Sequence, residues 1–498
     1  MLRAILLSSI VLNIGLLLGR FSGFIREALV AASFGATFEA DIVVLMLTVP
    51  DLMVSLLMGG AMGAILIPAF SQNPEIARKL LYQSAMIFLL LFCIVTAGIY
   101  WQVQALVTLL VPGFDSDQIE EAVNVVRIVL WLIPLTVLAG TTTAYLHYQN
   151  RFITPSLGTL IVNCTIIVGL YLVFIEQGSI ETLAAFVLMG GFLRFASQVI
   201  VIRPGYSPVK SFRPFLLRQP MIVQYGQAML SGSLLFMFPV VARAFASLEG
   251  PGNVAILNYS VRLVEFPLAV GVSFLTVVLF PKLSESFNSN QRQHRQYIKY
   301  GIQATLALSL LATITLILLV DEYSLFVFGY GEMSKTNVEN IAMLISVGLL
   351  VLPLQGLSVY ITAIFYSRAN TRTPMLINGF GLLFFVGALN LGLFGSGLLA
   401  IMWGLVAGFA IICALQLITL KIENLNWASI YWDKPFLLGG ICAIGFSILF
   451  NQWIVGLQLF LWLKLLMGLG GALFCLLVIA LFYPEIRAVL KSRLGIIG

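Results

Sequence analysis

Charged side chains interrupt otherwise apolar segments of this chain, and they are the residues best suited to carry out chemistry. The stretch 19–70 is flanked by hydrophobic sequence, yet its charged residues include Arg20, Arg26, Glu27, Asp41 and Asp51. A second stretch, 259–267, reads YSVRLVEFP and carries Arg262 and Glu265. A charge at the centre of a bilayer costs at least about 2.5–3.5 kcal/mol on insertion scales. These side chains are therefore expected to face a wet cavity or a charged partner.

Arginines in such a cavity are suited to an anionic ligand. A guanidinium pairs bidentately with phosphate and keeps its charge when it is desolvated. A diphosphate would take two or three of them, and we assign Arg20, Arg26 and Arg262 as substrate-binding residues. Arg243 is a fourth candidate, for which a cavity role and a structural salt bridge are equally supported.

The acidic residues are candidates for gating ion pairs with these arginines. Arg262 and Glu265 are three apart on one helix face and are expected to pair when the site is empty. Asp41 and Asp51 could hold the two arginines of the first helix in the same way, and release of such pairs to a substrate would distinguish two conformational states. The alternative for Asp41 is a capping role near the outer surface. The alternative for Asp51 and Glu265 is coupling to a proton or a monovalent ion.

Glycine and proline residues lie beside these charges. Gly19 and Gly23 are expected to loosen the first helix, and Pro50 is expected to kink the second. Polar groups beside broken helices near the middle of the membrane are typical of transporter substrate sites.

The elements that must position these residues are membrane helices. The 498 residues are 60% hydrophobic and only 10% charged, whereas soluble proteins have about 25% charged residues. A membrane helix needs about 20 apolar residues. This predicts an all-α polytopic membrane protein with 14 transmembrane helices, at 4–33, 41–70, 79–102, 119–147, 153–175, 181–203, 220–247, 252–281, 297–320, 337–366, 374–393, 396–420, 435–455 and 459–483.

Basic residues in the loops predict the orientation of these helices. Most of the 27 lysines and arginines fall in alternate loops, and the opposite loops are acidic. By the positive-inside rule both termini are cytoplasmic and the number of spans is even. Arg127 and Arg194 are expected to reach the outer and inner interfaces by snorkelling. Lys464 is expected to face either lipid or a groove.

An internal repeat divides the chain. Residues 132–157 resemble 351–376, with Pro134/Pro353 and Pro155/Pro374 each 219 apart and with Thr143/Thr362 at the same offset. The fourth span then corresponds to the tenth, which predicts two parallel six-helix lobes that alternate access to a site at their interface. The predicted parts are an N-lobe, a cytoplasmic linker, a C-lobe, two extra helices and a basic cytoplasmic tail, at 1–203, 204–219, 220–420, 421–483 and 484–498.

Several function classes are not supported by the sequence. The five cysteines lie in apolar segments without metal spacing, so we expect small core residues and no cofactor. No nucleotide-binding motif or paired-carboxylate loop is present, which argues against an enzyme. No basic run indicates nucleic-acid binding.

The two charged stretches carry a family resemblance. Residues 20–28 match R-x-x-G-F-x-R-[DE]-A and are followed by FGA, a lone aspartate, P-[ND]-L and a Gly/Ala-rich run that ends in IP. Residues 259–267 are similar to Y-x-x-R-L-x-E-F-P. The chain thus resembles the MurJ/MviN family, which belongs to a superfamily of multidrug and polysaccharide exporters. The resemblance implies a flippase of the bacterial inner membrane that moves lipid II, a polyprenyl-diphosphate-linked sugar used for peptidoglycan and cell-wall synthesis, and thus for cell shape.

The resemblance also implies roles for particular residues. The family's essential cavity arginines fall on Arg20, Arg26 and Arg262, and its essential acidic residues on Asp41 and Glu265. The two extra helices would form a lipid-facing groove for the polyprenyl tail. Transport would run from the cytoplasmic to the outer leaflet, driven by membrane potential or an ion gradient.

The chain departs from the family pattern close to these residues. The arginine pair that usually follows P-[ND]-L reads Val54 and Ser55, a usual glutamate reads Gly59, the usual asparagine after the proline is Asp51, and the usual aspartate before the eighth-helix arginine is Val261. The alternative is therefore a flippase for another lipid-linked glycan, such as an O-antigen or exopolysaccharide unit. An exporter of cationic compounds on the same superfamily fold is disfavoured by the arginines.

Overall fold

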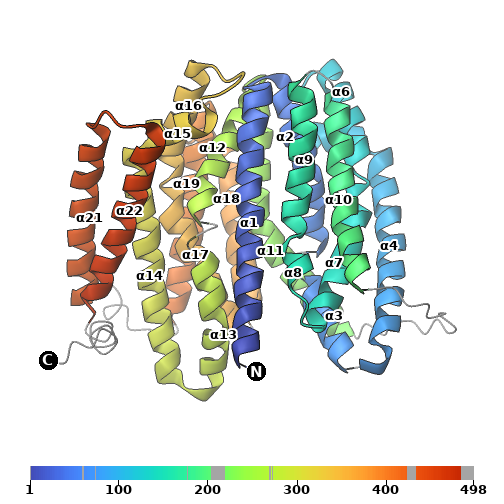
Figure 1. Cartoon of the computed structure of the whole chain (residues 1–498), viewed down its shortest axis with the longest axis horizontal. Coiled ribbons are helices and arrows are strands. Elements are labelled where there is room, and N and C mark those ends of the chain that lie inside the picture. The colour runs from blue at the N-terminus through green and yellow to red at the C-terminus, as the bar shows by residue number, and fades with distance from the viewer. Residues whose placement is uncertain are drawn as a thin grey trace. The chain divides into compact units, whose positions relative to one another are not determined.

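The computed structural model describes residues 2–58, 61–72, 74–175, 178–202, 219–268, 271, 273–368, 370–422 and 433–483. Every regular element within these ranges is helical, and none of them contains a strand (Figure 1). The chain therefore has the predicted all-α class. Val54 and Ser55 lie on a described helix, but their side chains, Gly59 and the tail 484–498 are outside the described part.

Eight of the described helices are long and apolar enough to cross a membrane. A ninth span results if Lys335–Gly348 and Val351–Ser367, which meet at a 47° bend, are counted as one. The protein is thus a multi-pass membrane protein, and the count of 14 spans stays a prediction. The eight are Pro74–Trp101, Ser116–Tyr148, Ile180–Ile202, Gln291–Leu318, Arg372–Asn390, Leu398–Leu420, Lys434–Val455 and Leu461–Leu481.

The chain forms two compact units. Unit 1 comprises Met1–Asn258 and Gly331–Met333, and unit 2 comprises Tyr259–Tyr330 and Ser334–Gly498. The lobe and linker boundaries drawn from the repeat stay predictions, and most of the linker lies outside the described ranges.

Unit 1 is built around the helix Gly158–Phe174, which packs against two other helices. Its elements are α1 (Leu2–Phe34), α2 (Phe38–Met58), α3 (Ala61–Gln72), η1 (Pro74–Ile76), α4 (Ala77–Trp101), α5 (Val103–Leu110), α6 (Ser116–Val129), α7 (Leu132–Tyr148), α8 (Ile153–Ser156), α9 (Gly158–Phe174), α10 (Ile180–Ile202), α11 (Gln219–Ser247) and the start of α12 (Asn253–Pro267). α9 packs against both α1 and α10 (Figure 1). It therefore positions side chains from two other helices.

Three glycines of α1 explain its close approach to α8 and α9. A Cβ added at Gly15, Gly19 or Gly23 would lie 2.3 Å from Ser156 Oγ, 3.0 Å from Thr159 Cβ and 3.3 Å from Asn163 Nδ2, respectively. Small residues one turn apart let helix backbones approach closely within a membrane. The prediction that Gly19 and Gly23 loosen the helix is wrong, because α1 runs unbroken through both.

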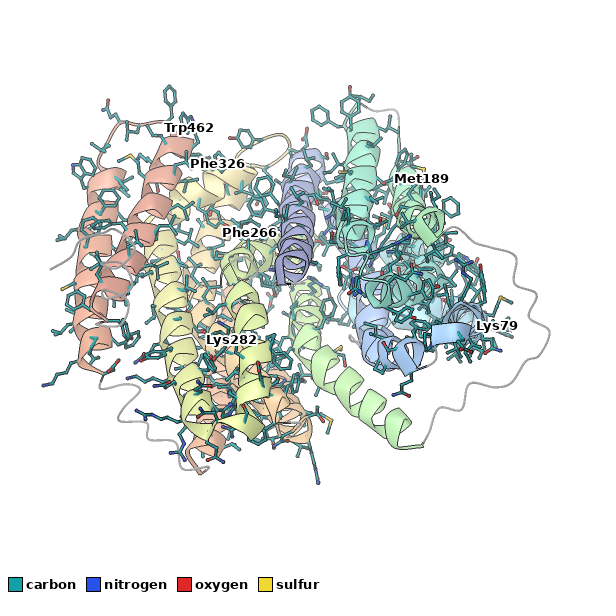
Figure 2. All side chains as sticks on the ribbon, turned by 60° about the horizontal axis from the view of Figure 1, so that its bottom comes forward. Lys79, Met189, Phe266, Lys282, Phe326 and Trp462 are labelled. Carbon is teal, nitrogen blue, oxygen red and sulfur yellow. The ribbon has the colours of Figure 1, made fainter. Side chains whose placement is uncertain are left out.

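Unit 2 contains the end of α12 and the remaining described helices. These are α13 (Ser273–Ser289), α14 (Gln291–Leu318), α15 (Val320–Phe328), α16 (Lys335–Gly348), α17 (Val351–Ser367), α18 (Arg372–Asn390), α19 (Leu398–Ile422), α21 (Lys434–Val455) and α22 (Leu461–Leu481). Its core packs around Tyr360 and Phe365 of α17, which are fully buried against α14 and α19. Lys282 of α13 lies below Phe326 and Trp462 in the view of Figure 2.

The sequence repeat has a matching contact in each unit. In unit 1, Thr142 and Thr143 of α7 donate hydrogen bonds to the side-chain oxygen of Gln198 on α10. In unit 2, Gln416 of α19 donates to Thr362 of α17 across 3.1 Å. Each unit therefore joins equivalent helices of the repeat through a buried glutamine.

The extra helices α21 and α22 pack on α14 and α15 of unit 2. Lys464 of α22 binds Glu322 Oε1 at 3.1 Å and donates to the Val455 carbonyl oxygen at 3.0 Å. Its ammonium group is thus held by protein groups, where we expected lipid or a groove. At the other end of the pair, Lys299 binds Asp433 at 3.0 Å.

Candidate anion-binding site

Arg26 of α1 is held by a network of polar side chains in unit 1. Its Nη1 donates to Asn163 Oδ1 of α9 at 3.1 Å, and its Nη2 lies 2.6 Å from Glu27 Oε1. The Asn163 amide nitrogen donates to the Gly19 carbonyl oxygen and to Ser22 Oγ, each at 3.0 Å. The side chain of Arg26 is only 13% exposed. Asn163 therefore fixes α1 against α9 and orients the guanidinium at the same time.

Glu27 extends this network. Its second oxygen accepts a hydrogen bond from Asn258 Nδ2 at 3.1 Å. The prediction that Asp41 or Asp51 holds Arg26 is wrong, because Arg26 pairs with the residue that follows it in the sequence. The paired carboxylate lowers the cost of a charge in this apolar helix.

Asp41 of α2 caps a helix. It is fully buried, and its Oδ2 and Oδ1 accept hydrogen bonds from the backbone N–H groups of Gly252 and Ala255 at 2.6 and 2.7 Å. These N–H groups belong to the start of α12, where a carboxylate is favoured by the unsatisfied donors and by the helix dipole. Gly252 has φ +82°, and a Cβ there would lie 2.2 Å from the Ala36 carbonyl oxygen. The capping geometry is thus present, and a gating role for Asp41 stays a prediction.

Arg243 is a contact between α11 and α2. Its Nη1 donates to Thr48 Oγ1 at 2.9 Å, and its side chain is buried. Thr48 in turn donates to the Val44 carbonyl oxygen at 2.7 Å. The Arg243–Thr48 hydrogen bond therefore links α11 to α2.

Arg20, Asp51 and Arg194 are the remaining charged residues of interest in unit 1. Arg20 and Asp51 are exposed on α1 and α2. The charge of Asp51 acts on Arg194 of α10. The Arg194 side chain lies over Gly158 at the start of α9, where a Cβ would lie 2.8 Å from its Nε.

Arg262 and Glu265 form the predicted ion pair on α12 in unit 2. Arg262 Nη1 lies 3.7 Å from Glu265 Oε2, and the two side chains are 32% and 29% exposed. A long, partly exposed pair contributes little stability. The Arg262–Glu265 contact is therefore a weak one.

An apolar groove of about 530 Å³ lies among α14, α21 and α22. It is lined by Tyr300, Gln303, Ala304, Ala307, Leu308, Phe436, Leu476, Ile479, Ala480 and Tyr483. Polar groups meet at its Gln303 end, where Tyr483 Oη donates to Gln303 Oε1 at 2.8 Å and Gln303 Nε2 donates to Asp433 Oδ2 at 3.2 Å. The groove thus has an apolar wall and one polar end.

Sequence reasoning missed the uncharged partners of these residues. Asn163, Asn258 and Thr48 lie far along the chain from the arginine or carboxylate that each one binds. The neighbouring Arg26–Glu27 dipeptide is the one signal that could have found the acidic partner. No group of three or more metal-binding side chains occurs in the part of the chain that is described.

Arginines within the spans of a multi-pass helical protein are typical of a membrane transporter. Solved transporters share the fold. A structure titled lipid II flippase MurJ in an inward closed conformation aligns with TM-score 0.79 and 19% identity, over 96% of this chain and 100% of that one. An inward-facing multidrug resistance MATE transporter aligns with TM-score 0.65 and 15% identity, over 82% and 96%.

The family model described as lipid II flippase MurJ matches residues 30–464, and this chain therefore belongs to that family. A probable lipid II flippase MurJ from Buchnera aphidicola subsp. Baizongia pistaciae (strain Bp) is 27% identical over 399 residues, which cover 76% of this chain and 75% of that protein. A probable lipid II flippase MurJ from Rickettsia prowazekii (strain Madrid E) is 24% identical over 386 residues and 76% of each chain.

Proposed function

We propose that this protein transports lipid II from the cytoplasmic to the outer leaflet of the bacterial inner membrane by alternating access. Membership of the family supports the substrate. The observation that carries the chemistry is Arg26, a guanidinium held within an apolar helix by Asn163 and Glu27. The orientation with both termini in the cytoplasm follows from the basic loops and is part of the proposal.

The diphosphate is bound by exchange of carboxylate partners. Arg26 gives its two Nη groups to Asn163 and Glu27 in this state, and Arg262 pairs loosely with Glu265. Charge-assisted bonds to phosphate are about twice as strong as neutral hydrogen bonds. A diphosphate can therefore displace Glu265 from Arg262, while Glu27 and Asn163 keep Arg26 oriented. Arg20, exposed on α1, is the third proposed ligand.

The polyprenyl tail occupies the groove among α14, α21 and α22. The lining of this groove is apolar along most of its length, so a hydrocarbon chain can pack there by van der Waals contact, as apolar groups do within a membrane. The activity is transport without catalysis. Membrane potential or a monovalent ion gradient would drive it.

Complementation tests the proposal. In bacteria depleted of their own lipid II flippase, the wild-type chain is expected to restore growth, and Arg26→Ala and Arg262→Ala are expected to fail. Arg127→Ala is the matched control, because Arg127 is an exposed arginine of α6 that lies over the Tyr100 ring at 5.5 Å. Absence of rescue by wild-type protein that is present in the membrane would favour the other lipid-linked glycan as substrate.

A further inference from the structure

Arg194 of α10 has no protein partner among the described residues. Its Nε is buried without a hydrogen bond, and its side chain makes no ion pair or ring contact within those ranges. The other intramembrane arginines differ from it: Arg26 binds Asn163 and Glu27, Arg243 binds Thr48, and Arg262 binds Glu265. An unpaired guanidinium within a membrane span is costly and is typical of a substrate pathway.

The position of Arg194 is set by packing. The residue lies eight positions before the end of α10, which is about 12 Å along the helix axis. A Cβ at Gly158 would lie 2.8 Å from its Nε and 3.2 Å from its Cδ and Cγ. The side chain therefore lies against the backbone of α9 where no other side chain intervenes.

Arg194 also lies near the part of α2 where this chain departs from its family. The charge of Asp51 acts on the Arg194 guanidinium, although the two form no ion pair. Positions 54 and 55 follow Asp51 by three and four residues on α2, and such positions share one face of a helix. These are the positions at which the family motif has arginines and this chain has Val54 and Ser55.

We propose that Arg194 is a further ligand of the substrate diphosphate, and that it supplies from α10 the positive charge that the family motif supplies from α2. This inference rests on the proposed function. The Arg194 Nε is buried against α9, and its two Nη groups are the donors that can bind phosphate oxygens.

Binding to purified protein tests the proposal, with undecaprenyl diphosphate in detergent as the probe. Arg194→Gln is expected to weaken binding about tenfold or more, which is the effect of losing a charge-assisted contact. Arg127→Gln, on the exposed arginine stacked over Tyr100, is the matched control and is expected to bind like wild type. Ser55→Arg added to Arg194→Gln is expected to restore affinity.

A second comparison separates a ligand from a counterion of Asp51. If Arg194 only neutralises Asp51, then Asp51→Asn will restore binding to the Arg194→Gln variant, and the proposal is overturned. If Arg194 binds the diphosphate, the double variant stays weak. Should Arg194→Gln fail to fold, Arg194→Lys keeps the charge but loses bidentate geometry. It is expected to bind severalfold more weakly, and wild-type affinity would overturn the proposal.

Different experimental results would refute the role of Arg194 and the proposed function. If wild-type protein neither binds undecaprenyl diphosphate nor complements the flippase, the proposed function is wrong. If wild-type protein does both and Arg194→Gln binds equally well, only the role of Arg194 is wrong.

Discussion

Arg26 owes its orientation to a neutral side chain and to its own neighbour in the sequence. Asn163 accepts from Arg26 and donates to α1 at Gly19 and Ser22. The Asn163 amide therefore holds α1 against α9 and also fixes the position of the Arg26 guanidinium. A substitution on α9 can therefore change the position of Arg26 without changing an arginine.

Asn163→Leu, which has nearly the same volume, is expected to destabilise the protein by about 1–3 kcal/mol, because it leaves Arg26 Nη1 without its partner. Its thermal unfolding midpoint should fall, and complementation should fall with it. Asn390→Leu is the control, since Asn390 bonds only the Val386 carbonyl oxygen one turn earlier on α18. An unchanged midpoint for Asn163→Leu would show that the network does not orient Arg26.

Contacts between residues that are close in the sequence could be predicted from their spacing. Contacts between residues that are far apart in the sequence could not. The Arg262–Glu265 pair followed from a separation of three residues on a helix. Asp51 was instead assigned to an arginine of the first helix, whereas its charge acts on Arg194, which lies on α10. No periodicity indicates which distant helix faces a given residue, so Asn163 and Arg194 could not be assigned as neighbours of α1 and α2.

At the scale of the helix, the role of Gly19 could not be deduced from the helix propensity of glycine. A glycine lowers helix propensity in water, but on α1 it allows contact with α9. The all-α class and the positions of the apolar helices followed from hydrophobicity, because backbone groups in a bilayer must be satisfied within each helix. Hydrophobicity did not predict which face of each helix packs against its neighbours.

Gly19→Val is expected to destabilise the protein by about 1–3 kcal/mol through overpacking against Thr159. Gly98→Val is the control, because Gly98 also lies within a helix, α4, but a Cβ there would meet nothing within 4 Å. Both variants carry the same β-branched residue, so the difference between their thermal unfolding midpoints isolates the α1–α9 contact. Equal midpoints would contradict this account of the packing.

At the scale of the molecule, the extra helices form, together with α14, the groove that we propose binds the polyprenyl tail. Salt bridges at Lys464 and Lys299 fasten the α21–α22 pair to α15 and α14 at its two ends, and Thr315 lies 3.4 Å from Ser447 between them. The helices that line the groove are therefore fixed to one another within unit 2. Tail binding and diphosphate binding can then be separated by substitution.

Ala304→Trp is expected to fill the groove with an indole and to weaken binding of undecaprenyl diphosphate, since the excluded part of the tail loses its packing contacts with the groove wall. Farnesyl diphosphate, whose short tail needs less of the groove, should bind almost as it does to wild type. Arg194→Gln should weaken binding of both ligands, because both carry the diphosphate. Ala105→Trp on the exposed face of α5 is the control. If Ala304→Trp left the preference for the longer chain unchanged, the tail would not lie in this groove, because Ala304 is part of its lining.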